Sequence, residues 1–156
     1  MRADRPRFSP SYGIATSTEG LLSWSWALER LAASRNYWIS TTRADGTPHA
    51  MPVWGVVHDG SLWFGTGGVK QQNLERTGRL VAHTESGDEC VILEGTATEH
   101  PVTRELLDAY EDKYAFRPGD DAQFWWVTGA PRCSLGASGW PCSSPFRKQR
   151  VQGAMI

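Results

Sequence analysis

The chain has 156 residues, 40% of them hydrophobic, and a formal net charge of −1 at pH 7. This length allows one domain, in which folding buries roughly two-thirds of the surface of the unfolded chain. Because both signs of charge are interspersed, the composition argues against a nucleic-acid partner and against a membrane partner.

Local patterns exclude further classes of protein. The basic start of the chain has no apolar run behind it, so no secretory signal is expected. No window approaches the ~18 consecutive apolar residues of a membrane span, and the expected location is cytoplasmic. Cys90, Cys133 and Cys142 are odd in number and show no Cys-x-x-Cys spacing, which supports neither a disulfide framework nor a metal site.

The first half of the chain predicts an arm, a helix and a three-stranded meander. Residues 1–20 are polar and lack periodicity, which is typical of a flexible arm. Ser23 can cap a helix whose apolar residues recur at helical spacing through Ala33. From Asn36 the period changes to two. Strands are predicted over 37–42, 49–57 and 61–66, joined by tight turns at Asp45-Gly46 and Asp59-Gly60.

The second half predicts two helices among further strands. A short helix over 70–76 ends near Gly78 and is followed by strands over 80–84 and 90–98. A second helix is predicted over 101–116, with Pro101 in its first turn, and a last strand over 124–128. Five or six short antiparallel strands with few helices favour a small barrel, since closure removes exposed sheet edges.

The stretch 64–71, Phe-Gly-Thr-Gly-Gly-Val-Lys-Gln, is the first candidate site. A strand ends in a glycine-containing loop that enters a helix with Lys70 at its start. Backbone N–H groups at a helix start, with a hydroxyl and an ammonium nearby, suit a phosphate group. The alternative is that Gly67 and Gly68 only turn the chain and that Lys70 is solvated, because short glycine turns are common.

The stretch 48–55, Pro-His-Ala-Met-Pro-Val-Trp-Gly, is the second candidate site. Pro52 cannot donate to a sheet ladder, so its strand lies at an edge or is distorted, which leaves backbone groups for a ligand. Trp54 beside it supplies a flat apolar wall. The alternative is an edge proline that prevents aggregation, with Trp54 in the core.

Two longer stretches carry a resemblance to a known family. They are SWSWALERLAASRNYWISTTRADGTPHAMPVWGVVHDGSLWFGTG from Ser23 and KQQNLERTGRLVAHTESGDECVILEGTA from Lys70. In order and spacing their pieces NYWIST, MPVWG, LWF-TG and K--NL resemble the pyridoxamine 5′-phosphate oxidase-like superfamily, in particular an actinobacterial branch that uses FMN or the deazaflavin coenzyme F-420. Each piece alone is only a weak sign of the superfamily, but the order of the pieces along the chain is distinctive of it.

The resemblance implies an α+β fold that is mainly β with flanking helices: an antiparallel, FMN-binding-like split β-barrel. It also implies a homodimer with two cofactor sites at the subunit interface. By position, the cofactor ring would lie against Met51, Pro52, Val53 and Trp54. The phosphate or phosphodiester would be held by Thr66, Lys70, Gln71 and Asn73. Residues 81–84 would flank the ring on the neighbouring strand.

The activity that the resemblance implies is hydride transfer between FMN or F-420 and a small conjugated molecule. Such a cofactor carries the hydride itself, so the protein supplies binding, orientation and exclusion of water, and few catalytic residues are expected. No set of catalytic residues stands out in the sequence. His83 or Tyr37 is a candidate to give a proton to a reduced substrate.

The end of the chain departs from the family pattern. No acidic residue follows Asp121, and the mixture of Ser, Pro, Gly, Arg and Cys after residue 129 does not readily build a strand or helix. We therefore divide the chain into an arm (1–20), a barrel domain (21–129) and a divergent or disordered tail (130–156) that leaves the barrel incomplete. A frameshift near Gly129 accounts for the tail; the alternative is a genuine basic tail.

Three functional hypotheses remain open. The chain is an FMN- or F-420-dependent oxidoreductase, or a module that binds flavin or haem without turnover, or an inactive frameshifted product. The absorbance spectrum of the purified protein separates them, because a flavin, a deazaflavin and a haem absorb at different wavelengths.

Overall fold

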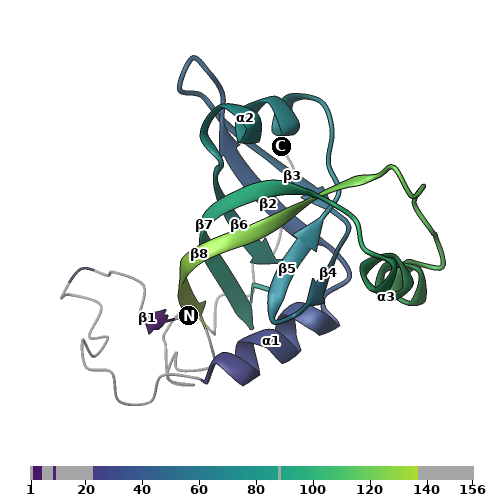
Figure 1. Ribbon diagram of the computed structural model, residues 1–156. Coiled ribbons are helices and arrows are strands. Elements are labelled where there is room, and N and C mark those ends of the chain that lie inside the picture. The colour runs from purple at the N-terminus through teal and green to yellow at the C-terminus, as the bar shows by residue number, and fades with distance from the viewer. Residues whose placement is uncertain (1, 5–8, 10–22, 88, 137–156) are drawn as a thin grey trace, which may run out of the picture.

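Figure 1 shows the computed structural model of the chain, which describes residues 2–4, 9, 23–87 and 89–136. Its elements are, in chain order, β1 (Arg2–Asp4), α1 (Trp24–Ala33), β2 (Tyr37–Thr42), β3 (Pro48–Val53), β4 (Gly55–His58), β5 (Ser61–Phe64), α2 (Val69–Thr77), β6 (Arg79–Thr84), β7 (Cys90–Pro101), α3 (Arg104–Tyr114) and β8 (Gln123–Gly136). None of the helices in this described part is long and apolar enough to cross a membrane.

The strands β2 to β8 form one curled antiparallel sheet. Their order is β3-β2-β6-β7-β8-β5-β4, and β1 pairs in parallel with β8 outside this path. β3 and β4 follow each other in the chain and yet lie at opposite ends of the order, so the sheet has to curl until its two edges approach. The result is a half-closed barrel flanked by three helices, the split β-barrel that the sequence predicts.

The junction of the two edges corrects one sequence prediction. A single strand over 49–57 is wrong, because the chain breaks at Trp54 into β3 and β4. β3 pairs with β2, with Pro52 opposite Trp38, whereas β4 pairs with β5, with Gly55 opposite Phe64. The edge position predicted for Pro52 is confirmed, since β3 ends the strand order. We call the junction Val53–Trp54–Gly55 the seam.

Helix starts follow the side chains that can cap them. The Ser23 hydroxyl accepts from the Trp26 N–H at 3.2 Å, as predicted for α1. The prediction that α3 begins at Pro101 is wrong, because β7 continues through that proline and the Thr103 hydroxyl caps the helix by accepting from the Leu106 N–H at 3.3 Å. A hydroxyl that satisfies an orphan N–H fixes the first turn more strongly than a proline does.

The last strand is longer than the sequence suggests. β8 continues to Gly136, where the composition predicted no regular structure after residue 129. Its backbone pairs with β7 on one side, with Val91 opposite Leu135, and Arg132 pairs with Arg2 of β1. Backbone pairing needs no hydrophobic alternation, and the twelve-residue β7 offers a long free edge as template. The rest of the predicted tail, 137–156, and most of the arm lie outside the described residues.

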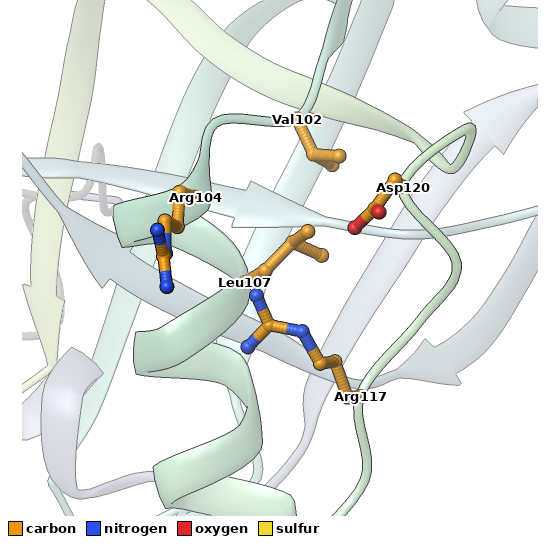
Figure 2. A pocket seen from close by; sticks show the side chains of 5 residues that line it. All are labelled: Val102, Arg104, Leu107, Arg117 and Asp120. Atoms are coloured by element: carbon orange, nitrogen blue, oxygen red, sulfur yellow. The ribbon is translucent and has the colours of Figure 1, made fainter.

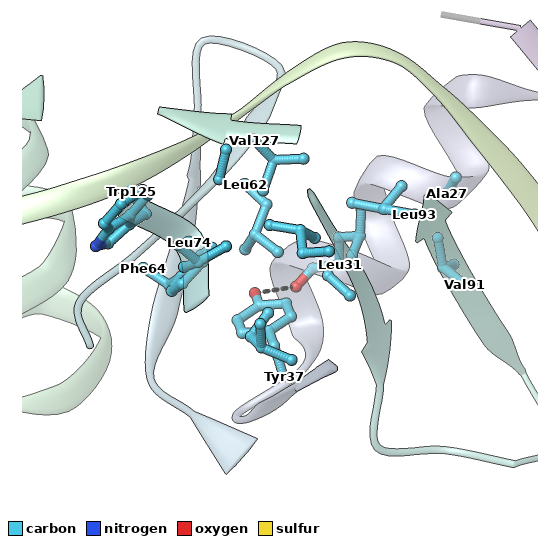
Figure 3. Packing of buried hydrophobic residues seen from close by; sticks show 14 residues of the cluster. Ala27, Leu31, Tyr37, Leu62, Phe64, Leu74, Val91, Leu93, Trp125 and Val127 are labelled. Atoms are coloured by element: carbon cyan, nitrogen blue, oxygen red, sulfur yellow. Dashed lines mark hydrogen bonds between the residues drawn. The ribbon is translucent and has the colours of Figure 1, made fainter. Parts of the chain in front are cut away.

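Two apolar clusters hold the barrel together. The larger fills its inside, where α1 contributes Ala27 and Leu31 against strand residues such as Tyr37, Leu62 and Leu93 (Figure 3). The Tyr37 hydroxyl donates to the Leu31 carbonyl, so its one polar atom is satisfied inside the cluster. The smaller cluster packs α3 against β4 and β8 through Val56, Leu106, Leu107, Tyr110, Tyr114 and Phe124.

The seam leaves no room for a side chain at Gly55. A Cβ there would lie 2.6 Å from the Trp63 carbonyl oxygen, which is backbone and cannot move aside. We expect Gly55→Ala to lower the free energy of unfolding in urea by about 1–3 kcal/mol, the usual cost of overpacking. Gly87→Ala is the matched control, since nothing lies within 4 Å of its Cβ position. Equal stability of the two variants would contradict the tight seam.

Candidate cofactor site at the seam

The four residues predicted to face a cofactor ring lie on both faces of β3 and at its end. Met51 and Trp54 are 52% and 41% exposed, unusually open for such large apolar side chains. Met51 pairs with Ile39 and Pro52 with Trp38, so the two side chains point to opposite faces, as strand alternation requires. Val53 is half-buried and packs against the core. Met51 and Trp54 are therefore the large apolar side chains that remain open to a ligand.

Lys70 joins the two predicted segments. Its side chain is buried in the first turn of α2, at 4% exposure. The ammonium lies 3.4 Å from the Met51 carbonyl oxygen, to which it donates a long hydrogen bond. Burial lowers the pKa of Lys70 to about 8, because desolvation disfavours the charged form. No ion pair of Lys70 occurs among the described residues. An anion beside Lys70 would therefore raise this pKa again, because it favours the charged form.

The other residues predicted to hold a phosphate have different surroundings. Asn73 is buried, and its amide donates to the Thr41 hydroxyl at 3.0 Å, which docks α2 on β2. Gln71 is half-buried and donates to Glu75 at 2.9 Å on the helix surface. Thr66 is half-buried in the loop before α2. Thr66, Lys70 and Gln71 thus surround the helix start, whereas the Asn73 amide is already used inside the protein.

The start of α2 retains features of an anion site. Gly68 stands at the N-cap with φ of 65°, and no side chain caps the helix there. No acidic residue lies in the first turn. The N–H groups of a helix start carry a partial positive charge, and side chains of Ser, Thr, Asp or Asn usually satisfy them. Here a ligand oxygen has the room that a capping side chain would occupy.

Sequence reasoning missed two residues that reach the seam from α3. The Tyr114 hydroxyl accepts from the Gly55 N–H at 2.9 Å, and it lies 2.7 Å from the Gly55 carbonyl and 2.6 Å from the Arg35 carbonyl. The Lys113 ammonium donates to the Gly55 carbonyl at 3.0 Å and to the Tyr37 hydroxyl at 2.8 Å. Helical spacing placed Lys113 and Tyr110 on α3, but nothing local signals a partner 58 residues away.

Burial dominates the electrostatics of this group. It lowers the pKa of Lys113 to about 8 and raises the pKa of Tyr37 well above its usual range. It also raises the pKa of Tyr114, against the opposing effect of the hydrogen bond with Gly55. The Lys113 ammonium lies 4.8 Å from the ring centroid of Tyr37 and 5.4 Å from that of Tyr114, so two ring faces replace part of its hydration.

The two candidate proton donors differ in access. Tyr37 has no exposed surface, and its hydroxyl is used by Leu31 and Lys113. It is therefore a core residue that cannot reach a substrate. His83 is half-buried on the outer face of the sheet, stacked on Trp38 with ring centroids 6.5 Å apart. Its Nδ1 donates to the Thr84 carbonyl at 2.8 Å, so Nε2 can donate a proton only from the imidazolium form.

A cavity of about 480 Å³ lies apart from the seam (Figure 2). It is lined by Val102, Arg104, Leu107, Arg117 and Asp120, none of which the sequence singled out. Arg117 is paired with Asp108 at 2.7 Å and with Glu111 at 2.9 Å, so its charge is already compensated. Arg104 and Asp120 then present opposite charges, and the cavity has no net preference for an anion. Groups of His, Cys, Asp or Glu able to hold a metal do not occur in the described part of the chain.

Comparison with known proteins supports the fold. No family model and no curated protein matches the chain. Among solved structures, an F-420 reductase matches at 21% identity and a TM-score of 0.54, covering 66% of this chain and 90% of that chain. A proposed pyridoxamine 5′-phosphate oxidase from Listeria innocua matches at 16% identity and 0.56, covering 72% and 96%. A haem-binding protein from Mycobacterium smegmatis matches at 20% and 0.51, covering 74% and 59%. These likenesses show that the chain has the split-barrel fold of these structures.

The lowered pKa of Lys113 predicts a pH-dependent stability. Below about pH 8 the lysine is charged in both the folded and the unfolded chain, and the cost of burying the charge is fully present. Between pH 8 and the unfolded value of about 10.4 the unfolded chain binds more protons, so stability rises with pH. We expect the natural chain to gain stability relative to Lys113→Met as the pH rises through this range.

Urea unfolding from about pH 7 to 9.5 measures this difference, below the range in which tyrosines of the unfolded chain ionise. Lys70 titrates in both proteins, so its contribution cancels in the difference. A difference that stays flat with pH would mean that Lys113 is not desolvated in solution.

Proposed function

We propose that the protein is an oxidoreductase that binds FMN or the deazaflavin F-420 at the seam and transfers a hydride between it and a small conjugated molecule. The observation that carries the proposal is the contact of the Lys70 ammonium with the Met51 carbonyl. This contact brings a cation at an uncapped helix start close to an edge strand with exposed apolar side chains. A phosphorylated compound with a flat ring needs the cation for its phosphate and the apolar side chains for its ring.

Each part of the site has one task in this proposal. Lys70, Thr66 and Gln71, with the N–H groups of the first turn of α2, bind the phosphate or phosphodiester. Met51 and Trp54 are the exposed contacts of the ring, Val53 supports the strand from the core side, and Pro52 keeps the edge of the strand free of a pairing partner. Asn73 acts one turn further along, where its bond to Thr41 fixes the helix that carries Lys70. These residues fit a group of this kind.

The chemistry of the bound cofactor is hydride transfer, and the protein supplies binding, orientation and a dry surface. Of the two candidate proton donors to a reduced substrate, His83 is the more accessible one, since the Tyr37 hydroxyl is enclosed in the core. The cytoplasmic location expected from the sequence is part of this proposal.

A second copy of the chain completes the site in this proposal. The outer face of β3, β2 and β6 carries Pro52, Trp38 and His83 side by side, followed by Ala50, Ser40 and Val81 in the next row. Trp38 is 38% exposed on this face. A flat surface with a central tryptophan is typical of a subunit interface. The two cofactor sites of the dimer then lie where the subunits meet.

Reversing the charge of Lys70 tests cofactor binding. Lys70→Glu replaces attraction by repulsion at the phosphate, and we expect the affinity for FMN or F-420 to fall at least about 10- to 100-fold, because a charge-assisted hydrogen bond contributes about 1.5–3 kcal/mol. Absorbance titration measures the affinity. Arg79→Glu is the matched control, with the same charge change on an exposed residue of β6. Equal affinities in both variants would exclude the anion site.

Assembly gives an independent test. We expect a dimer in sedimentation at micromolar concentration, and a monomer for Trp38→Glu, because a buried unpaired carboxylate opposes association. Ala32→Glu, which adds the same charge at an exposed position of α1, is expected to leave the dimer intact. A natural chain that sediments as a monomer would contradict the proposed interface.

A haem-binding module without turnover is the second candidate, favoured by the likeness to the haem-binding protein from Mycobacterium smegmatis. The absorbance spectrum of the purified protein separates the candidates. A flavin or deazaflavin band supports the oxidoreductase, a Soret band supports haem, and a protein that binds none of the three on addition is the inactive product.

A further inference from the structure

The Trp54 indole lies parallel to one neighbouring ring, that of Tyr114. Trp54 stacks on Tyr114, with ring centroids 4.8 Å apart and 8° between the ring planes. Phe116 meets it at an angle of 62° with centroids 6.4 Å apart. Trp54 nevertheless stays 41% exposed. Tyr114 therefore covers one face of the indole and Phe116 meets it at an angle, while the exposed part of the indole is open to a flat ligand.

Tyr114 in turn is held against the backbone of the seam. Its hydroxyl binds the Gly55 N–H and faces the carbonyls of Gly55 and Arg35, so it both accepts and donates. Lys113 binds the same Gly55 carbonyl, and its ammonium lies over the Tyr114 ring. Tyr110 packs beside Tyr114 at 4.8 Å from the previous turn of α3. Rotation of the Tyr114 ring would break bonds to buried backbone groups, which is costly.

The C-terminal end of α3 helps to keep Tyr114 and Phe116 beside Trp54. Ala115, directly after Tyr114, has φ of 52°, a left-handed conformation that glycine usually takes at a helix end. Its N–H donates to the Glu111 carbonyl at 2.8 Å, which closes the last turn. An alanine held in this conformation stores backbone strain, and such strain persists where surrounding contacts fix the chain. Phe116 is the next residue and reaches the edge of Trp54.

We propose that Tyr114 and Lys113 are positioning residues that hold Trp54 with one face open for the ring of the ligand. The inference deepens the proposed function and rests on it for the identity of that ligand. It adds α3 to a site for which the sequence pointed to residues 51–54, 66–73 and 81–84. A Trp54 side chain that is already fixed before binding loses little conformational entropy when the ligand binds. This raises the affinity without any new contact.

The test compares Tyr114→Phe with Tyr110→Phe in the full chain. Tyr114→Phe keeps the stacking ring and removes only the hydroxyl, whereas Tyr110 is an equally buried tyrosine on the same helix with no contact to the seam backbone. The first readout needs no cofactor. It is the indole N–H signal of Trp54 in a nitrogen–proton NMR spectrum, assigned by its loss in Trp54→Phe. The second readout is the affinity for FMN and for F-420, with Lys113→Met as a further variant.

We expect Tyr114→Phe and Lys113→Met to move the Trp54 signal and to lower cofactor affinity about tenfold, and Tyr110→Phe to change neither. An unmoved Trp54 signal in Tyr114→Phe overturns the positioning. A moved signal with unchanged affinity overturns its importance for binding. If the natural chain binds neither cofactor and the signal still moves, the positioning of Trp54 stands and the proposed function fails.

Discussion

The fold depends on the seam, where a single residue, Trp54, connects the two edges of the sheet. β3 and β4 end the strand order, so no ladder of hydrogen bonds joins them along the chain. The Gly55 N–H and carbonyl are instead satisfied by side chains of α3, Tyr114 and Lys113. Buried backbone groups need partners, and without these the break would be costly. Closing the barrel therefore requires a helix that lies far along the sequence.

The same break makes the region suitable for binding. Both β3 and β4 are edge strands, so each pairs its backbone on one side only. The interrupted edge leaves Met51 and Trp54 exposed and the Met51 carbonyl open to Lys70. Lys70 has lost most of its hydration and makes one long hydrogen bond in return. This desolvation lowers the pKa of Lys70 to about 8. The proposed function gives this ammonium an anionic partner, the phosphate of the cofactor.

Local physical chemistry made much of the fold predictable. The Asp59-Gly60 turn has both residues at positive φ, 49° and 70°, as a tight hairpin requires. The Ser23 cap and the glycine at the end of α2 fix helix ends within one residue of expectation. The meeting of residues 48–55 with 66–71 was predicted from the family resemblance together with the glycine-rich loop. The exposure of Met51 and Trp54 fits the part proposed for them.

The sequence alone determined most element types, the restriction of Pro52 to an edge or a distorted strand, and the two candidate segments, because turns, caps and alternation act within a few residues. Only the tertiary structure decided that the strand over 49–57 breaks at Trp54, that β8 runs to Gly136, and that the Asn73 amide is used by Thr41. It also brought Tyr114 and Lys113 to Gly55. These outcomes depend on partners that are far away in the sequence, and backbone pairing and burial carry no local signal of where such partners lie.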